Sequence, residues 1–218
     1  MEAIDYKKLY ALQDAVLQEV FVTEHEFYLT GGTCLSRFYV AKRYSDDLDF
    51  FTNRSARYSF SLKSIIAALE KKFSIKTEAQ SKDFARFILN DQLQVDFVND
   101  TAFHYKDIKV TESGYLIDNV ENIFANKLTA IIGRDSAKDV FDIILIAKYF
   151  NFSYQDILTA AQKKMAFAIE DLIVRLKEFP LAWLNEVKPI EPFTITGKDI
   201  ETVCRDMVEG KDNSLFVG

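Results

Sequence analysis

The chain has 218 residues, of which 49% are hydrophobic and 28% charged, which suits a folded globular protein of one larger domain or two small ones. Its 27 lysines and arginines against 33 aspartates and glutamates leave a formal net charge of −6, which excludes nucleic-acid binding through a broadly positive surface. Any contact with RNA must therefore use a local basic patch. The two cysteines, Cys34 and Cys204, are too isolated in the sequence to indicate a disulfide scaffold or a zinc finger.

The N-terminal segment MEAIDYKKLYALQDAV is amphipathic and lacks the apolar run of a signal peptide. No stretch reaches the roughly 18 apolar residues that a membrane-spanning helix needs. We therefore expect a cytoplasmic protein without a membrane partner.

Periodicity predicts alternating helices and strands in the first half of the chain. In chain order they are a helix over 5–20, a strand over 26–30, a helix over 33–40, a strand in the second half of 43–51, a helix over 61–73, and strands over 74–77, 85–90 and 94–99. The pair Asn90-Asp91 predicts a hairpin turn between the last two strands.

From Val120 onward the pattern is almost entirely helical. The predicted helices cover 120–133, 136–150, 153–166, 168–178 and 198–209. We therefore expect an α+β domain over 1–119 and a helical domain over 120–218 packed against it, with no linker rich in Pro, Gly or Ser between them.

Aspartates are the main candidates for chemistry. Residues i and i+2 of a strand point to the same face, so Asp47 and Asp49 project together while Leu48 and Phe50 face the core. If the strand that carries Asp96 lies beside them, three carboxylates converge. Such a group is repulsive unless cations relieve it, and two divalent metals there can hold a triphosphate and stabilise a leaving pyrophosphate. The alternative is that these are surface carboxylates that cap turns.

Gly31-Gly32 at a strand end, directly before a helix, indicates a phosphate contact, because glycine lets the backbone approach closely and a helix N-terminus offers N–H donors. Thr33 or Ser36 would add a hydroxyl donor. A glycine pair or an Asp-x-Asp alone is weak support. The order strand, glycine pair, helix, Asp-x-Asp strand and later lone Asp is much more specific.

These motifs resemble a known family. The run Gly31-Gly32-Thr33-Cys34-Leu35-Ser36 and the run Arg43-Tyr44-Ser45-Asp46-Asp47-Leu48-Asp49-Phe50-Phe51 are similar to the first motif of AbiEii/AbiGii-type nucleotidyltransferase toxins, a polymerase-beta-like group. The similarity continues at Asn126-Lys127-Leu128, at Arg134 and at Lys138-Asp139-Val140-Phe141-Asp142-Ile143. Lys138 stands where the family often has Arg in its Arg-Asp-x-x-Asp motif. The similarity covers residues 28–150.

The resemblance implies a polymerase-beta-like core, a mixed sheet with flanking helices, followed by a C-terminal helical bundle. It assigns Asp47, Asp49 and Asp96 to Mg²⁺ or Mn²⁺, with Asp96 as a ligand or a base. It adds Lys127 and Asp142 as catalytic residues, Lys127 on the triphosphate and Asp142 or Asp139 orienting a basic side chain or contacting the nucleotide. The nucleotide-binding residues implied are Gly31, Gly32, Thr33, Ser36, Arg43, Ser45, Lys127, Arg134 and Asp139.

The implied function is transfer of a nucleotidyl group from a nucleoside triphosphate to a hydroxyl, as the toxin partner of an antitoxin. Some members of the family act on the acceptor end of tRNA, so RNA is the expected acceptor. A protein side chain or a small molecule such as an aminoglycoside remains an alternative acceptor. A non-catalytic nucleotide- or partner-binding member of the fold is the other reading.

Plainer interpretations stay open for the charged residues. Lys127 and Arg134 share one helix face, which favours a common anionic target, but they also suit a solvated surface. Asp142 lies one helical turn after Lys138, so a structural salt bridge is an alternative. Arg43 is equally compatible with phosphate binding and with an ordinary surface charge. A haloacid-dehalogenase-type phosphatase also uses Asp-x-Asp, but its motif ends a buried apolar strand, whereas polar residues precede Asp47.

Overall fold

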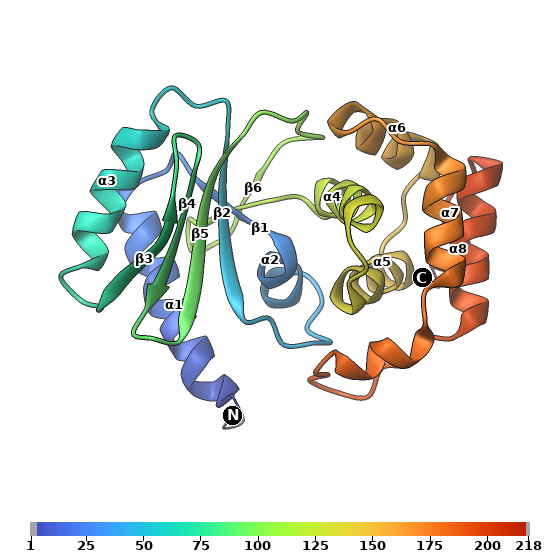
Figure 1. The fold of residues 1–218 in the computed structure, drawn as a ribbon, viewed down its shortest axis with the longest axis horizontal. Coiled ribbons are helices and arrows are strands. Elements are labelled where there is room, and N and C mark those ends of the chain that lie inside the picture. The colour runs from blue at the N-terminus through green and yellow to red at the C-terminus, as the bar shows by residue number, and fades with distance from the viewer. Residues whose placement is uncertain (1–3, 217–218) are drawn as a thin grey trace. The chain divides into compact units, whose positions relative to one another are not determined.

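The computed structural model describes residues 4–216, so the outermost residues of both expected domains, 1–3 and 217–218, lie outside it. The chain forms two compact units (Figure 1). Unit 1 consists of Met1–Cys34, Ser45–Thr101 and Ile108–Asp118. Unit 2 consists of Leu35–Tyr44, Ala102–Asp107 and Asn119–Gly218, and therefore takes in two short segments from the first half of the chain.

Unit 1 contains a seven-stranded sheet in the order β3-β4-β5-β2-β1-β7-β6. Its strands are β1 (Tyr28–Thr30), β2 (Asp47–Asn53), β3 (Ile75–Gln80), β4 (Phe84–Leu89), β5 (Leu93–Asp100), β6 (Lys109–Val110) and β7 (Leu116–Ile117). The β2–β5 pair is parallel, whereas β1–β2 and β4–β5 are antiparallel. The expected α+β class with a mixed sheet is confirmed; the short strands β6 and β7 were not expected.

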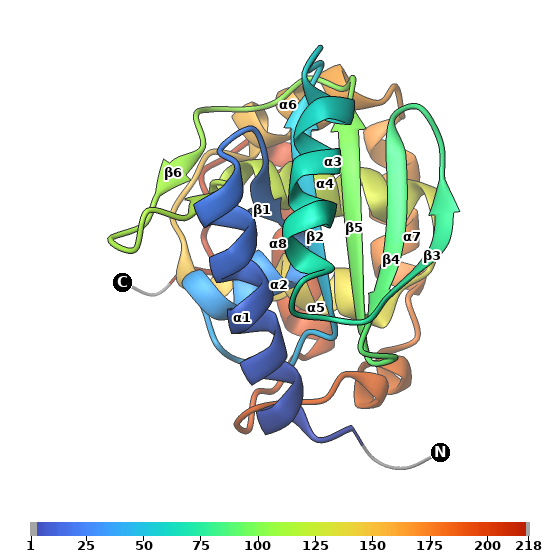
Figure 2. The ribbon, with the colours of Figure 1, turned by 90° about the vertical axis from the view of Figure 1, so that its left-hand side faces the viewer.

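Two helices, α1 (Tyr6–Thr23) and α3 (Tyr58–Leu69), cover one face of this sheet (Figure 2). The covered face is apolar because every second residue of the central strands points into it. Phe50 of β2 and Phe97 of β5 are fully buried there and stack at 5.2 Å between ring centroids. Phe21 of α1 contacts Phe50, and the Tyr58 hydroxyl of α3 donates to the Phe97 carbonyl. The opposite face is therefore the one on which polar side chains gather.

Most expected elements of the first half exist with shifted ends. Helix α1 continues beyond the expected end to Thr23, because Val20 and Phe21 are buried and extend its apolar face. The hairpin at Asn90-Asp91 is confirmed, since both residues have positive φ, 50° and 54°, as tight turns between strands require. Helix α2 (Gly31–Phe38) begins at the glycine pair rather than after it.

Unit 2 is built from helices, and all five that the sequence predicted are present. They are α4 (Val120–Gly133), α5 (Ala137–Tyr149), α6 (Tyr154–Lys164), α7 (Ile169–Glu178) and α8 (Gly197–Glu209), with a 3-10 helix, η1 (Leu181–Glu186). Side chains of Asn119, Ser136, Ser153 and Thr196 cap four of these helices by accepting a backbone N–H bond. Helix α5 is buried along nearly its whole length and is the core of the unit.

Among the described residues, no helix combines the length and hydropathy that a bilayer crossing would need.

Candidate active site

The polar face of the sheet in unit 1 carries the paired aspartates. Asp47 and Asp49 are half-buried on β2, while Leu48 is fully buried on the other face, as the alternation predicted. Strand β5 lies parallel to β2 with Asp96 directly beside Asp49, and Asp96 is buried. Because side chains of paired residues point to the same face, Asp47, Asp49 and Asp96 lie on one surface of the sheet. The structure thus places the three expected carboxylates on neighbouring strands.

Arg86 of β4 is a site residue that the sequence reasoning missed. Its guanidinium engages both oxygens of the Asp96 carboxylate, Nε donating to Oδ1 at 2.8 Å and Nη2 to Oδ2 at 2.6 Å. The Gln94 amide adds a longer bond to Oδ2 at 3.3 Å. The hydrogen bond with Asp96 raises the pKa of Arg86 above its ordinary value, and the charges of Asp96, Glu78 and Asp49 act in the same direction.

The signal for Arg86 lies in the hairpin register. Leu89 pairs with Leu93 next to the turn. Because β4 and β5 are antiparallel, moving the same number of residues away from the turn along each strand places Arg86 opposite Asp96. The turn was predicted from Asn90-Asp91, but its length, and with it the register, was not.

Gly31 shapes the same face from the adjacent strand end. It has a φ of +71°, a conformation that L side chains rarely adopt, and a Cβ placed on it would collide with Oδ2 of Asp49. The Thr33 hydroxyl donates to the backbone carbonyl of Asp47, fastening the start of α2 to β2. The absence of a side chain at Gly31 therefore leaves space for the Asp49 carboxylate. Thr33 is fully buried, and its hydroxyl holds β2 in place.

A divalent cation fits the donor chemistry of this face, because carboxylate oxygens are the protein ligands that Mg²⁺ prefers. Within residues 4–216, however, no three Asp, Glu, His or Cys side chains are gathered closely enough to hold a metal ion alone. Asp47 and Asp49 are the members that Arg86 does not engage by hydrogen bonds. Mg²⁺ sites with one or two carboxylates are completed by water and substrate phosphates, and this face suits that kind of site.

A second cluster of expected residues lies in unit 2 and is an ion-pair network that is buried except for the exposed Arg134. Arg43 is 2% exposed and grips Asp142 with Nε at 2.6 Å from Oδ1 and Nη2 at 2.7 Å from Oδ2. Lys127 of α4 contacts Asp142 at 2.9 Å and Asp139 at 2.8 Å. Arg134 binds the other oxygen of Asp139 at 2.7 Å. The anionic target shared by Lys127 and Arg134 within this unit is therefore the Asp139 carboxylate.

The charges of this network are mutually stabilised. Burial alone would raise the pKa of Asp142, but the Arg43 and Lys127 charges outweigh it and hold the pKa below the ordinary value. Burial would lower the pKa of Lys127, yet the Asp142 and Asp139 carboxylates raise it above the ordinary value. Both groups are thus held in their charged forms.

Other expected nucleotide-binding residues are buried. Ser45 belongs to unit 1, where its N–H donates to the Tyr10 hydroxyl at 3.2 Å and its carbonyl accepts from the Gln13 amide at 3.0 Å. Ser36 is 3% exposed and belongs to unit 2. Gly32, in the first turn of α2, is also buried.

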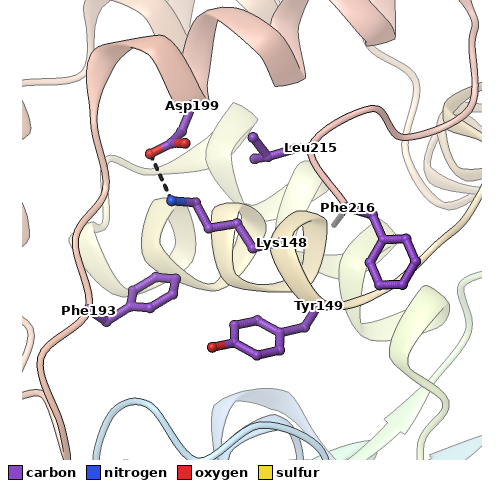
Figure 3. Close-up of a pocket in the computed structure, with 6 residues that line it drawn as sticks. All are labelled: Lys148, Tyr149, Phe193, Asp199, Leu215 and Phe216. Carbon is purple, nitrogen blue, oxygen red and sulfur yellow. Dashed lines mark ion pairs between the residues drawn. The ribbon is translucent and has the colours of Figure 1, made fainter. Parts of the chain in front are cut away.

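A cavity of about 450 Å³ in unit 2 is separate from these clusters (Figure 3). It is lined by Lys148, Tyr149, Phe193, Asp199, Leu215 and Phe216, none of which was an expected site residue. The charge of Lys148 is met by Asp199 at 3.0 Å, as the dashed line in Figure 3 shows.

Solved structures share this fold. JHP933 from Helicobacter pylori is 20% identical, with a TM-score of 0.61, covering 96% of this chain and 94% of that one. A putative nucleotidyltransferase from H. pylori, also 20% identical, has a TM-score of 0.62 and covers 95% of this chain and 97% of its own. MenT4, the nucleotidyltransferase toxin Rv2826c from Mycobacterium tuberculosis H37Rv, is 11% identical, with a TM-score of 0.58 over 93% of this chain and 82% of that one.

The mixed sheet with its flanking helices is thus the fold of nucleotidyltransferase toxins. The family described as nucleotidyl transferase AbiEii toxin of the type IV toxin–antitoxin system matches residues 16–212, and this chain belongs to that family. A relative from Aquifex aeolicus (strain VF5), the uncharacterized protein aq_aa25, is 29% identical over 176 residues, which is 78% of this chain and 81% of the relative. The chain is therefore classed as a nucleotidyltransferase, and the resemblance inferred from the sequence motifs is confirmed.

Proposed function

We propose that this protein transfers a nucleotidyl group from a nucleoside triphosphate to a hydroxyl of RNA, in particular tRNA, in a reaction that depends on Mg²⁺ or Mn²⁺. The observation that carries the proposal is the placement of Asp47 and Asp49 on the polar sheet face with Asp96 beside Asp49. The family supports the nucleotidyl transfer and the role as a toxin.

In the proposed reaction the acceptor hydroxyl oxygen attacks the α-phosphorus, the bond to the β-phosphate oxygen breaks, and pyrophosphate leaves. A divalent cation bound there would neutralise the negative charge that develops on the phosphate oxygens. Asp47 and Asp49 are the residues that would hold it. Asp96, the buried carboxylate beside them, would receive the proton of the attacking hydroxyl or share in holding the cation.

Lys127 is the proposed phosphate contact in unit 2. An ammonium has three N–H donors, and the Asp139 and Asp142 contacts account for two of them. The third donor is the one proposed to reach a phosphate oxygen, while the two carboxylates fix the direction of the side chain. Asp139 and Asp142 are thereby positioning residues.

The placement of Arg43 favours a supporting role over the nucleotide contact expected from the sequence. Its guanidinium is buried and committed to Asp142, so it holds that carboxylate against Lys127. Its segment is anchored within unit 2, since Tyr44 N–H donates to the Lys188 carbonyl at 3.0 Å.

As a toxin, the protein would work in the cytoplasm, where nucleoside triphosphates and tRNA are available, and would be neutralised by a partner antitoxin. The proposed compartment and the proposed antitoxin partner both rest on the membership of the chain in this toxin family.

A transfer assay tests the proposal. Purified protein is incubated with Mg²⁺, total RNA and each labelled nucleoside triphosphate in turn, alongside Asp49→Asn and, as a matched control, the exposed hairpin variant Asp91→Asn. We expect a labelled band of tRNA size with the wild type and Asp91→Asn, lost in Asp49→Asn and on chelation of the metal. Label on protein or on a small molecule would keep the chemistry and replace the acceptor. No transfer by folded wild-type protein would favour the non-catalytic binding member.

A further inference from the structure

Arg86 stands out on the carboxylate face because it brings a permanent positive charge to a place proposed to collect cations. A carboxylate offers roughly four positions that can accept a hydrogen bond. At Asp96 the Arg86 guanidinium occupies two of them, one on each oxygen, and the Gln94 amide occupies another. A metal ion ligated by Asp96 would have to displace at least one of these bonds.

The charge balance of the face points the same way. Arg86 brings one positive charge to the face that carries Asp47, Asp49 and Asp96. A second divalent cation close to Asp96 would meet the guanidinium at short range, and like charges within a few ångström repel strongly.

Arg86 has the freedom that such an exchange needs. Its side chain is 37% exposed, whereas that of Asp96 is 8% exposed, so the arginine and not the aspartate is the movable partner. The Glu78 charge on the neighbouring strand also acts on Arg86 and offers a second carboxylate once Asp96 is released.

We propose that Arg86 stays ion-paired with Asp96 while no nucleotide is bound and so acts as an internal counter-cation. Asp96 then becomes a metal ligand only after this ion pair breaks. The proposal deepens the proposed function and rests on it. It assigns Arg86 as a positioning residue that decides when the third carboxylate joins the metal site.

Calorimetric titration with Mn²⁺ alone, without nucleotide or acceptor, tests this on the full chain. Arg86→Met should bind Mn²⁺ about tenfold more tightly than wild type, the size of effect typical of groups that surround metal ligands. The gain should vanish in Arg86→Met combined with Asp96→Asn, because the gain comes from the released Asp96. Lys63→Met removes an equal charge at an exposed position of α3, the helix that covers the other face of the sheet. It should stay within about twofold of wild type, because exposed charges away from the site are screened.

Unchanged or weaker Mn²⁺ binding by Arg86→Met overturns the proposal, as does a gain that persists in the double variant. If circular dichroism shows that Arg86→Met is unfolded, Arg86→Gln is used with the same expectations. Because Mn²⁺ binding is read without any transfer, a negative result here is distinct from a failure of the transfer assay. Wild type that transfers nucleotides while Arg86→Met binds Mn²⁺ no better would overturn the role of Arg86 and leave the proposed function standing.

Discussion

The Asp49 carboxylate lies against Gly31 in the space that a Cβ at residue 31 would fill. Gly31 also has a φ of +71°, so its replacement combines backbone strain with displacement of a proposed metal ligand. We predict that Gly31→Ala lowers the free energy of unfolding by at least about 1–2 kcal/mol and lowers transfer activity. Urea unfolding and the transfer assay measure the two effects.

The matched control is Gly114→Ala, because Gly114 has a similar φ of +80° and nothing within 4 Å of an added Cβ. Gly114→Ala should lower the free energy of unfolding through backbone strain but keep full transfer activity. Equal loss of activity in both variants would show that the contact between Gly31 and Asp49 does not matter for the reaction.

Asp49→Asn should reduce transfer at least about 100-fold while leaving the fold intact, because a neutral amide cannot replace a carboxylate that acts on the transition state. Single-turnover kinetics and thermal unfolding check this. Asp91→Asn, at an exposed turn position where Asn tolerates positive φ, should be indistinguishable from wild type in both.

Arg43→Met should destabilise the protein by about 3 kcal/mol, because it leaves the buried Asp142 carboxylate with one charged partner fewer. Equilibrium urea unfolding measures the change. The comparison variant is Arg175→Met, which breaks the exposed pair with Asp135 and should cost no more than about 0.5 kcal/mol. Similar values for the two variants would mean that the buried pair adds nothing beyond a surface one.

The Arg43–Asp142–Lys127 network should make stability depend on pH at both extremes. The pKa of Asp142 is held below its ordinary value of 3.8, so its contribution is present above that value and is lost as the pH falls through the lowered pKa. The pKa of Lys127 is raised above 10.5, so its contribution is complete below 10.5 and is lost as the pH rises through the raised pKa.

Urea midpoints across the pH range test this expectation. Between about pH 5 and 10 the contribution of the network should be constant. Asp142→Asn should be less stable at neutral pH, and the difference from wild type should shrink at acid pH as Asp142 becomes protonated. A difference that stays constant down to acid unfolding would contradict the lowered pKa of Asp142.

The sequence was informative wherever structure depends on neighbours in the chain. The alternation of Asp47, Leu48, Asp49 and Phe50 predicted which side chains share a face, because the strand period of two is a local property. The helical periodicity after Val120 predicted α4 for the same reason. The glycine pair and Asp-x-Asp were enough to suggest the family.

The partners of these residues were decided by tertiary structure. Arg43 and Asp142 are 99 residues apart in the chain, and no local pattern indicates that they pair. Arg86 meets Asp96 only because the length of the hairpin sets their register. Local periodicity determined which residues face the same way, whereas which charge meets which carboxylate followed from chain packing, since ion pairs form across distances that sequence spacing does not encode.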